Sequence, residues 1–428
     1  MPFERPSSAP RRIAVVGGGI SGMAAAWLLR DTHRVVLFEA APRLGGHART
    51  VMAGRRGDLP VDTGFIVFNE VNYPRLTKMF AALGVPTAES DMSFGASIGG
   101  GALEYGLAGP GAIFAQKRNA VDPRFLRMLR DIFRFNARAM DMAAPGMTIR
   151  DLLDRLGTGA WFRDCYLLPF SGAIWSTPAR DILDFPARTL VRFFENHALL
   201  SHTGQHQWHT VRGGSREYVG RLRDALERAG VEIRTHAPVA RVAEDKGRVR
   251  VETAAHDGES FDEAILATHA DISRAMLAAG PAAHALRDVR YQPNKAVLHA
   301  DAALMPRRRA VWSSWNYAEP AGPRPERIDL TYWMNSLQPI PHDDPLFVTL
   351  NANRTIAPET IQDEVEFRHP VYDQAALRAQ GTIRALNGRD GIWFCGAWMR
   401  NGFHEDGFAS AADVVEAMAA RDAAAFAS

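Results

Sequence analysis

The chain has 428 residues, of which 46% are hydrophobic, so it can bury a large core, and its length suggests two or three domains. Its formal net charge of +2 is too small to indicate a nucleic-acid-binding surface. Cys165 and Cys395 are the only cysteines, and they show neither a C-x-x-C motif nor a metal-ligand spacing, which favours a reducing compartment.

Neither end of the chain indicates export or membrane insertion. Residues 1–10 contain Glu4, three prolines and two serines but no apolar stretch, which predicts a disordered leader rather than a signal peptide. No run of 18 or more apolar residues occurs, so no transmembrane helix is predicted. We therefore expect a cytoplasmic protein, with peripheral contact to the inner membrane left open.

The first elements form a nucleotide-binding pattern. Residues 13–16 are an apolar, β-branched run typical of a buried parallel strand, and residues 23–30 predict a helix. Between them, Gly17, Gly19 and Gly22 have the G-x-G-x-x-G spacing that permits a tight turn, close approach of a pyrophosphate and close helix packing. A second strand over residues 34–38 ends at Glu39, roughly 20 residues on, where a carboxylate binds ribose hydroxyls.

The segment after Glu39 indicates which dinucleotide is bound. Arg43, Gly45, Gly46 and Thr50 follow the pattern E-x-x-x-R-x-G-G-x-x-x-T. This pattern resembles the second fingerprint of the flavoprotein amine oxidase and phytoene desaturase superfamily. The resemblance implies FAD, with Arg43 near the pyrophosphate and the glycines near the flavin. Residues 62–64 resemble the D-x-G element of the same family. Together these motifs assign to the cofactor Gly17, Gly19, Ser21, Gly22, Glu39, Ala40, Arg43, Gly45, Gly46, His47, Thr63 and Gly64.

The helix predicted over residues 122–140 is the most basic amphipathic stretch in the chain. Its apolar side is expected to carry Phe125, Leu129, Ile132, Phe133 and Met140. Most of the remaining surface is arginine: Arg124, Arg127, Arg130, Arg134 and Arg138. It is either a domain helix with a solvated basic face or an element that binds a membrane surface.

The chain then returns to the cofactor. Trp208 begins a strand that leads into Gly213-Gly214-Ser215 and a helix over residues 216–228, resembling an internal G-G motif of the family. By the same resemblance, Val239 contacts the adenine through its backbone and Thr268 ends the strand that carries an A-T-P signature. Residues 391–396 form the last cofactor strand.

These segments predict an α/β fold, amine oxidase-like, with a Rossmann-like FAD-binding domain and an α+β substrate domain. The FAD-binding domain is discontinuous, since its motifs occur in three separate parts of the chain. Its expected segments are residues 11–75, 205–285 and 385–428. The substrate domain is expected to take up residues 76–204 and 286–384.

The C-terminal segment resembles the closing FAD motif of amine oxidases. The resemblance assigns Gly396, Ala397, Asp406, Gly407 and Phe408 to the cofactor. Asp406 suits the N-cap of a helix that begins at Gly407. The N-terminus of that helix is expected to point at the N1/C2=O edge of the flavin, where its dipole stabilises negative charge.

Three departures from the family pattern bear on the substrate. Ala397 and Trp398 stand where the family carries a glutamate, and Phe403 replaces a tyrosine of the aromatic cage, which weakens the case for an amine. The segment around Phe367 and His369 lacks the cysteine that monoamine oxidases use for covalent flavin. FAD is therefore expected to be noncovalent.

Lys295 and His404 are the candidates for catalysis beside Phe403. Lys295 resembles the lysine with which amine oxidases hold a water at flavin N5, and it is alternatively an exposed strand lysine. His404 is either a general base that titrates near neutrality or a structural hydrogen-bonding group. Four histidines, His197, His202, His206 and His209, fit no metal-ligand spacing, so no metal is predicted.

Several shorter segments make the resemblance more specific, among them Ser314-Trp-Asn-Tyr, Thr331-Tyr-Trp-Met-Asn and the Phe403–Gly407 motif. They resemble a bacterial branch that includes desaturases of methylated fatty acyl chains on the route to furan fatty acids. The resemblance implies hydride transfer from a lipid acyl chain to flavin N5, by a monomer or homodimer without nucleic acid. An amine oxidase, or a redox-neutral flavin isomerase or mutase, remains the alternative.

Overall fold

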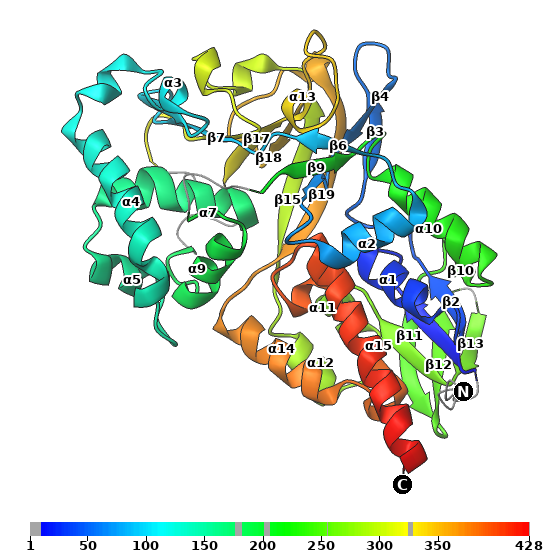
Figure 1. The fold of residues 1–428 in the computed structure, drawn as a ribbon. Coiled ribbons are helices and arrows are strands. Elements are labelled where there is room, and N and C mark those ends of the chain that lie inside the picture. Colours follow the sequence, from blue (N-terminus) through cyan, green and yellow to red (C-terminus); the bar gives the residue numbers. More distant parts are fainter. Residues whose placement is uncertain (1–9, 176–181, 201–205, 255, 324–327, 428) are drawn as a thin grey trace, which may run out of the picture.

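The computed structural model describes residues 10–175, 182–200, 206–254, 256–323 and 328–427 (Figure 1). Residues 1–9 of the expected leader lie outside the described residues. Within the described part of the chain, none of the helices combines the length and the apolar character that a membrane crossing requires.

The N-terminal motifs belong to a parallel five-stranded sheet of order β10-β2-β1-β14-β20. Strands from three separate parts of the chain meet in this sheet. The predicted first two strands are confirmed, and the sheet consists of β1 (Arg12–Val16), β2 (Arg34–Phe38), β10 (Glu232–Arg234), β14 (Glu263–Leu266) and β20 (Ile392–Phe394).

The two faces of this sheet bury two different cores because successive side chains of a strand point to opposite sides. Ile13 and Val15 pack in one core with α1 (Ile20–Leu29), α10 (Arg216–Arg228) and α15 (His404–Ala427). Ala14 and Val16 pack in the other, against an antiparallel sheet and three helices: β11 (Val239–Asp245), β12 (Arg248–Thr253), β13 (His256–Phe261), α11 (Ala270–Ala275), α12 (Pro281–Leu286) and α14 (Gln374–Leu386). The result is three layers with the sheet in the middle.

The other half of the molecule contains a seven-stranded sheet of order β19-β15-β18-β17-β16-β7-β8. All its pairs are antiparallel except β16 with β7. Its strands are β7 (Phe94–Ile98), β8 (Leu103–Gly106), β15 (Tyr291–His299), β16 (Trp315–Ala318), β17 (Asp329–Trp333), β18 (Phe347–Leu350) and β19 (Ile361–Pro370). Helices on one side complete the core: α3 (Pro110–Ile113), α4 (Pro123–Met142), α5 (Ile149–Leu156), α6 (Ala160–Phe162), α7 (Leu168–Trp175) and α9 (Ala187–Asn196).

Two segments pack on the cofactor half, although the sequence assigned them mainly to the substrate half. Helix α2 (Pro74–Leu83) buries Leu76, Met79 and Phe80 in the core of α1 and α10. Helix α14 buries Ala379 and Ile383 beside the last cofactor strand. Helices α2 and α14 therefore belong to the core of the cofactor half, because the apolar faces of both helices pack against it.

Helix α4 confirms the element predicted over residues 122–140, but its buried face differs from the expected one. Phe125, Met128, Ile132 and Phe135 are buried, together with Ala139, whereas the Phe133 side chain is 57% exposed. The buried face is centred between Met128 and Ile132 because α4 packs against α5, α6 and α9 on that side. The predicted apolar face therefore differs from the observed buried face by a rotation about the helix axis, which places Phe133 toward solvent.

Candidate FAD site

The first glycine loop connects β1 to α1, and it is closely packed except beside Gly19. Gly17 has φ +108°, and a Cβ on Gly22 would lie 1.8 Å from the Gly17 carbonyl oxygen, so both positions require glycine. Gly19 is different, because a Cβ there would meet no heavy atom within 4 Å. The backbone is therefore tight around Gly17 and Gly22 but leaves free space beside Gly19.

Glu39 lies at the end of β2, next to this loop. Its Oε2 accepts a hydrogen bond from the Gly18 N–H at 2.6 Å, and its Oε1 accepts one from the Ala41 N–H at 2.7 Å, while Ala40 is exposed. Each carboxylate oxygen retains a lone pair for a ribose hydroxyl. Backbone bonds from Ala237 and to Arg234 bring the segment before Val239 alongside Glu39.

The second loop lies directly on the first. The Gly45 N–H donates to the Gly18 carbonyl at 2.8 Å, and a Cβ on Gly46 would lie 3.2 Å from Gly19 Cα. Arg43 donates to the Ala48 carbonyl at 2.9 Å and to the Gly46 carbonyl at 3.0 Å. Arg43 thus holds this loop in shape, a role that the pyrophosphate assignment alone did not predict.

The start of α15 meets the start of α1. A Cβ on Gly407 would lie 2.8 Å from Ile20 Cγ2 and from Ser21 Oγ, so glycine lets the two helix ends touch. The helix begins at His404 rather than at Gly407, and Asp406 is not its N-cap. The Asp406 carboxylate instead reaches back and accepts the Phe403 N–H at 3.0 Å. Burial raises the pKa of Asp406 to about 6. Phe408 is buried in the core behind this helix end.

The ends of β14 and β20 complete the same edge of the sheet. Thr268 follows β14, and its Cγ2 would lie 3.0 Å from a Cβ on Gly17. Gly396 follows β20 and donates its N–H to Ser410 Oγ at 2.9 Å, and the Ala397 carbonyl accepts the Gly402 N–H at 3.1 Å. The carboxyl ends of neighbouring parallel strands form the expected binding edge of such a sheet.

Asp62 is a buried hub that the sequence marked only as part of a D-x-G element. It ends β4 (Leu59–Asp62), which pairs with β3 (Thr50–Ala53). Its carboxylate accepts hydrogen bonds from Thr50 Oγ1 at 2.6 Å, Ser215 Oγ at 2.7 Å and Gln338 Nε2 at 3.0 Å. Burial raises the pKa of Asp62 to about 6. It thereby connects the cofactor loops to the substrate half.

Beside Asp62, Thr63 and Gly64 contact the second loop. Thr63 accepts a hydrogen bond from Arg49 at 3.1 Å, and a Cβ on Gly64 would lie 2.0 Å from the His47 carbonyl oxygen. The glycine at position 64 therefore lets the D-x-G element lie against the loop that carries His47.

The structure places His404 in a buried, hydrogen-bonded position, which does not agree with titration near neutrality. Its Nε2 lies 2.6 Å from Tyr218 Oη, and its ring is stacked on Phe65 at 3.9 Å between centroids. Burial lowers the pKa of His404 to about 3. The other reading left open by the sequence, a structural hydrogen bond, agrees with this geometry.

The burial of His404 predicts how stability depends on pH. Its folded pKa of about 3 lies below the unfolded value of about 6.5, so the unfolded chain binds more protons and stability falls as pH drops through 6.5. Between pH 7 and pH 5 this histidine should remove about 2 kcal/mol from the free energy of unfolding. We expect His404→Gln to lose less stability to urea than wild type does between pH 7 and pH 5. The exposed control His284→Gln should leave the slope unchanged, and an unchanged slope in His404→Gln would refute the assignment.

Phe403 lies in an aromatic wall. It stacks on Phe193 at 4.9 Å and 18°, and Phe193 stacks on His197 at 3.8 Å. Burial lowers the pKa of His197 to about 4, so this ring is neutral at pH 7. The wall therefore presents neutral rings without a hydroxyl or a charge.

A second group of rings surrounds His47, the only one of them that the sequence assigned to the cofactor. His47 stacks on Phe367 at 5.0 Å and on His369 at 5.7 Å, and His269 lies 5.5 Å away. Burial lowers the pKa of all three histidines, that of His369 to about 4. One feature of the sequence could have indicated this group: His269 directly follows Thr268, which the sequence assigned to the cofactor. Asn294 also joins this group, 3.0 Å from His369 Nδ1.

Lys295 does not lie beside the rings that surround His47. Asn294 is buried, but the next side chain of β15 points the other way, and Lys295 Nζ pairs with Glu364 at 2.8 Å on an exposed surface. It lines a surface groove of about 350 Å³ together with Arg354. This geometry agrees with the alternative of an exposed strand lysine.

We expect Lys295→Met to leave both flavin reduction and flavin reoxidation unchanged, because the ammonium group lies in an exposed ion pair. Stopped-flow measurement of both half-reactions checks this, with Glu364→Gln as the matched control for loss of the pair. A reoxidation rate that falls in Lys295→Met but not in Glu364→Gln would show that Lys295 acts in flavin reoxidation.

No cluster of metal-ligating side chains occurs among the residues that the structure describes. His202 lies outside the described residues. His197 Nδ1 lies 2.9 Å from the Phe193 carbonyl, and His206 Nε2 lies 3.4 Å from the Asn196 carbonyl. These two histidines thus bond to backbone.

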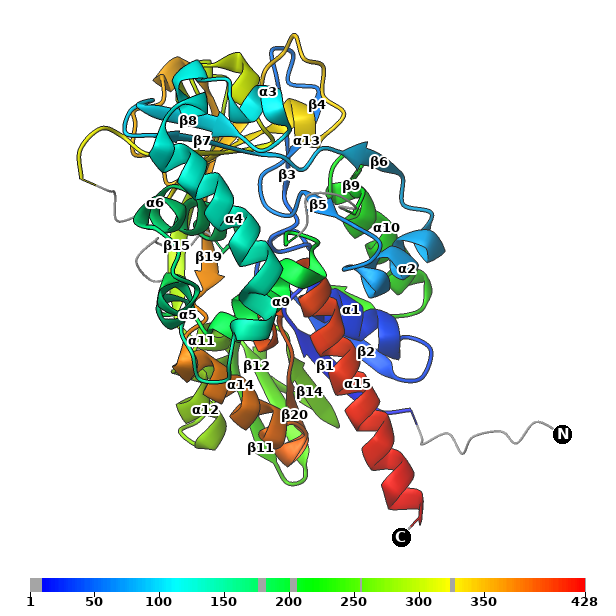
Figure 2. The ribbon, with the colours of Figure 1, turned by 60° about the vertical axis from the view of Figure 1, so that its left-hand side comes forward.

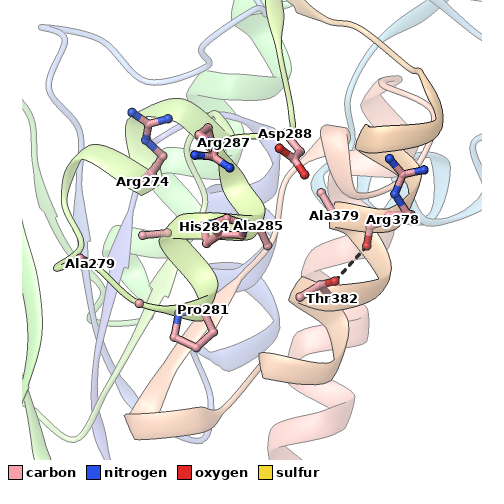
Figure 3. A pocket seen from close by; sticks show the side chains of 12 residues that line it. Arg274, Ala279, Pro281, His284, Ala285, Arg287, Asp288, Arg378, Ala379 and Thr382 are labelled. Carbon is pink, nitrogen blue, oxygen red and sulfur yellow. Dashed lines mark hydrogen bonds between the residues drawn. The ribbon is translucent and has the colours of Figure 1, made fainter.

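A groove of about 790 Å³ opens on another side, between α11, α12 and α14. Figure 3 shows Arg274, Arg287 and Arg378 around it, with Asp288 between Arg287 and Arg378. None of the predicted site residues lines this groove. The groove is therefore separate from the candidate site, although alanine and proline side chains line it together with the three arginines.

The residues at the glycine loops fit FAD on four observations. The space beside Gly19 admits a pyrophosphate, and the N-termini of α1 and α15 meet there with positive ends suited to negative charge. Glu39 is placed for the ribose. His47 Nε2 is buried without a hydrogen-bond partner among the described residues, which leaves it a donor or acceptor for a bound group.

A family model and solved structures match this chain over most of its length, whereas the curated relatives match less than a third of it and of their own length. A family model described as flavin-containing amine oxidoreductase matches residues 20–419. Coproporphyrinogen III oxidase of Mycobacterium tuberculosis is 41% identical over 80 residues, which are 18% of this chain and 17% of that protein. (S)-6-hydroxynicotine oxidase of Paenarthrobacter nicotinovorans is 32% identical over 125 residues, 28% of each protein. A CLA-producing fatty acid isomerase from P. acnes has a TM-score of 0.70 at 16% identity, covering 96% of this chain and 99% of its own.

Proposed function

Since the chain belongs to the flavin-containing amine oxidoreductase family and is an FAD-dependent oxidoreductase, we propose that its substrate is a lipid acyl chain, into which it introduces a double bond. A hydride and a proton leave adjacent carbons, and a C=C bond forms between them. When bound, FAD supplies the two-electron acceptor for the hydride. An external acceptor must then reoxidise the cofactor.

The aromatic wall of Phe403, Phe193 and His197 carries this proposal. Its rings are neutral at pH 7, and burying an acyl chain against such surface gains about 0.8 kcal/mol per CH₂ group. An ammonium group could contact the faces of these rings, but Phe403 and Phe193 carry neither a hydroxyl nor a carboxylate to bind it. The wall orients an apolar chain and excludes water, whereas it gives an amine little to bind.

A fatty acid isomerase is the second candidate, because a protein of that activity has the same fold. Such a reaction moves a double bond without net electron flow. The same wall would hold its substrate. The two reactions differ in whether the flavin remains reduced after one turnover without oxygen.

Anaerobic incubation with methylated fatty acids, free or linked to phospholipid, tests the proposal. A desaturase should lose its flavin absorbance once and form one double bond per FAD, with benzylamine as the control substrate that leaves the flavin oxidised. Product that accumulates without bleaching would identify an isomerase instead. Rapid bleaching by benzylamine and none by lipid would contradict the acyl-chain proposal.

A further inference from the structure

Helix α4 has three sectors, of which one is buried. The buried sector of Phe125, Met128, Ile132 and Phe135 packs in the helical core, so α4 is a domain helix. Two sectors remain at the surface. At 100° per residue, one is centred on Leu126 and Phe133 and the other on the arginines. Figure 2 shows α4 along the outer surface of the helical region.

The first surface sector is apolar. Leu126 is 43% exposed and Phe133 is 57% exposed, and Val121 just before the helix is 80% exposed. These are three of the seven large hydrophobic side chains that are exposed in the described part of the chain. Exposed apolar side chains are therefore concentrated at one helix.

The second surface sector is basic. Arg127 and Arg130 share the buried carboxylate of Asp131, at 4.0 Å and 3.1 Å, yet their side chains remain 60% and 65% exposed. Among the described residues, no carboxylate forms an ion pair with Arg134 or Arg138. Positive charge thus lies next to the apolar sector on the same surface.

We propose that α4 lies flat on an anionic phospholipid bilayer, with its arginines at the headgroups and Leu126 in the headgroup boundary. A helix of 20 residues extends about 30 Å and offers this contact along its length. Adjacent basic and apolar sectors are the pattern of helices that bind membrane surfaces. The charge complements anionic headgroups, and the apolar side chains distinguish a bilayer from a purely acidic protein surface. Docking goes beyond the proposed function, because vesicle binding does not depend on any reaction.

The test is sedimentation of the FAD-loaded protein with mixed phosphatidylglycerol and phosphatidylcholine vesicles. Wild type should bind these vesicles, bind pure phosphatidylcholine much less, and release as salt shortens the Debye length. Each arginine near the surface contributes about fivefold in binding, so Arg134→Glu with Arg138→Glu should weaken it by at least about 25-fold. Circular dichroism and flavin absorbance should remain those of wild type.

Two controls separate docking from general charge and apolarity. Arg221→Glu with Arg228→Glu makes the same charge change on α10 and should bind vesicles as wild type does. Leu126→Ser should weaken binding, whereas Ile272→Ser, at a side chain with 45% exposure on α11, should not. Wild-type binding by the Arg134/Arg138 variant would overturn the proposal, as would no binding of wild type to anionic vesicles. Vesicle binding without lipid oxidation would refute the proposed function and leave docking intact.

Discussion

Gly19→Val should yield a folded protein that retains no FAD. Gly19 has φ −74° and ψ −177°, which a residue with a side chain adopts readily, and a Cβ there meets no heavy atom of the chain within 4 Å. The valine therefore costs the folded chain little, yet it fills the space that a pyrophosphate needs. The measurement is flavin absorbance of the purified protein together with its circular dichroism.

Gly381→Val is the matched control for this variant, because Gly381 in α14 also has no heavy atom within 4 Å of a built Cβ. It should retain FAD. Gly22→Ala should instead destabilise the fold, because its Cβ would lie 1.8 Å from the Gly17 carbonyl oxygen. FAD at wild-type content in Gly19→Val would show that the cofactor does not approach this loop.

Asp62→Ala should destabilise the protein by about 3–5 kcal/mol. The substitution removes the acceptor of the Ser215 N–H and hydroxyl, the Thr50 hydroxyl and the Gln338 amide, and leaves these donors unpaired in a buried place. The measurement is urea unfolding followed by tryptophan fluorescence and by flavin release. Loss of FAD should accompany unfolding, because Asp62 connects the loop beside Gly64 to the segment at Ser215.

Asp58→Ala is the control, since Asp58 forms an exposed pair with Arg56 and should change stability by less than about 1 kcal/mol. Equal stability of the two variants would contradict the role of Asp62 as a hub. The raised pKa of Asp62, about 6, opposes the histidine effect on acidification. The pKa of Asp62 is higher in the folded than in the unfolded chain. Its contribution to the free energy of unfolding therefore becomes more favourable as pH falls from 6 toward 4.

The sequence did not determine the environments of the candidate catalytic residues Lys295 and His404. A family resemblance places a lysine on β15 but cannot tell whether Asn294 or Lys295 faces the cofactor, because a shift of one residue reverses the face. The pairing of β15 with β19 and β18 buries Asn294 and leaves Lys295 in an exposed ion pair with Glu364. His404 similarly depends on Tyr218, 186 positions earlier in the chain, whose hydroxyl lies at its Nε2.

The sequence by itself determined the glycine loops, the parallel strands beside them and Glu39. These depend on residues within a few positions of one another and on backbone freedom, which composition and spacing reveal directly. Only the tertiary structure decided the surroundings of His404 and Lys295, the hydrogen bonds of Asp62, the ring group around His47 and the buried face of α4. Each of these depends on burial and on partners brought from distant parts of the chain, and it is burial that determines whether a histidine is charged or a face is covered.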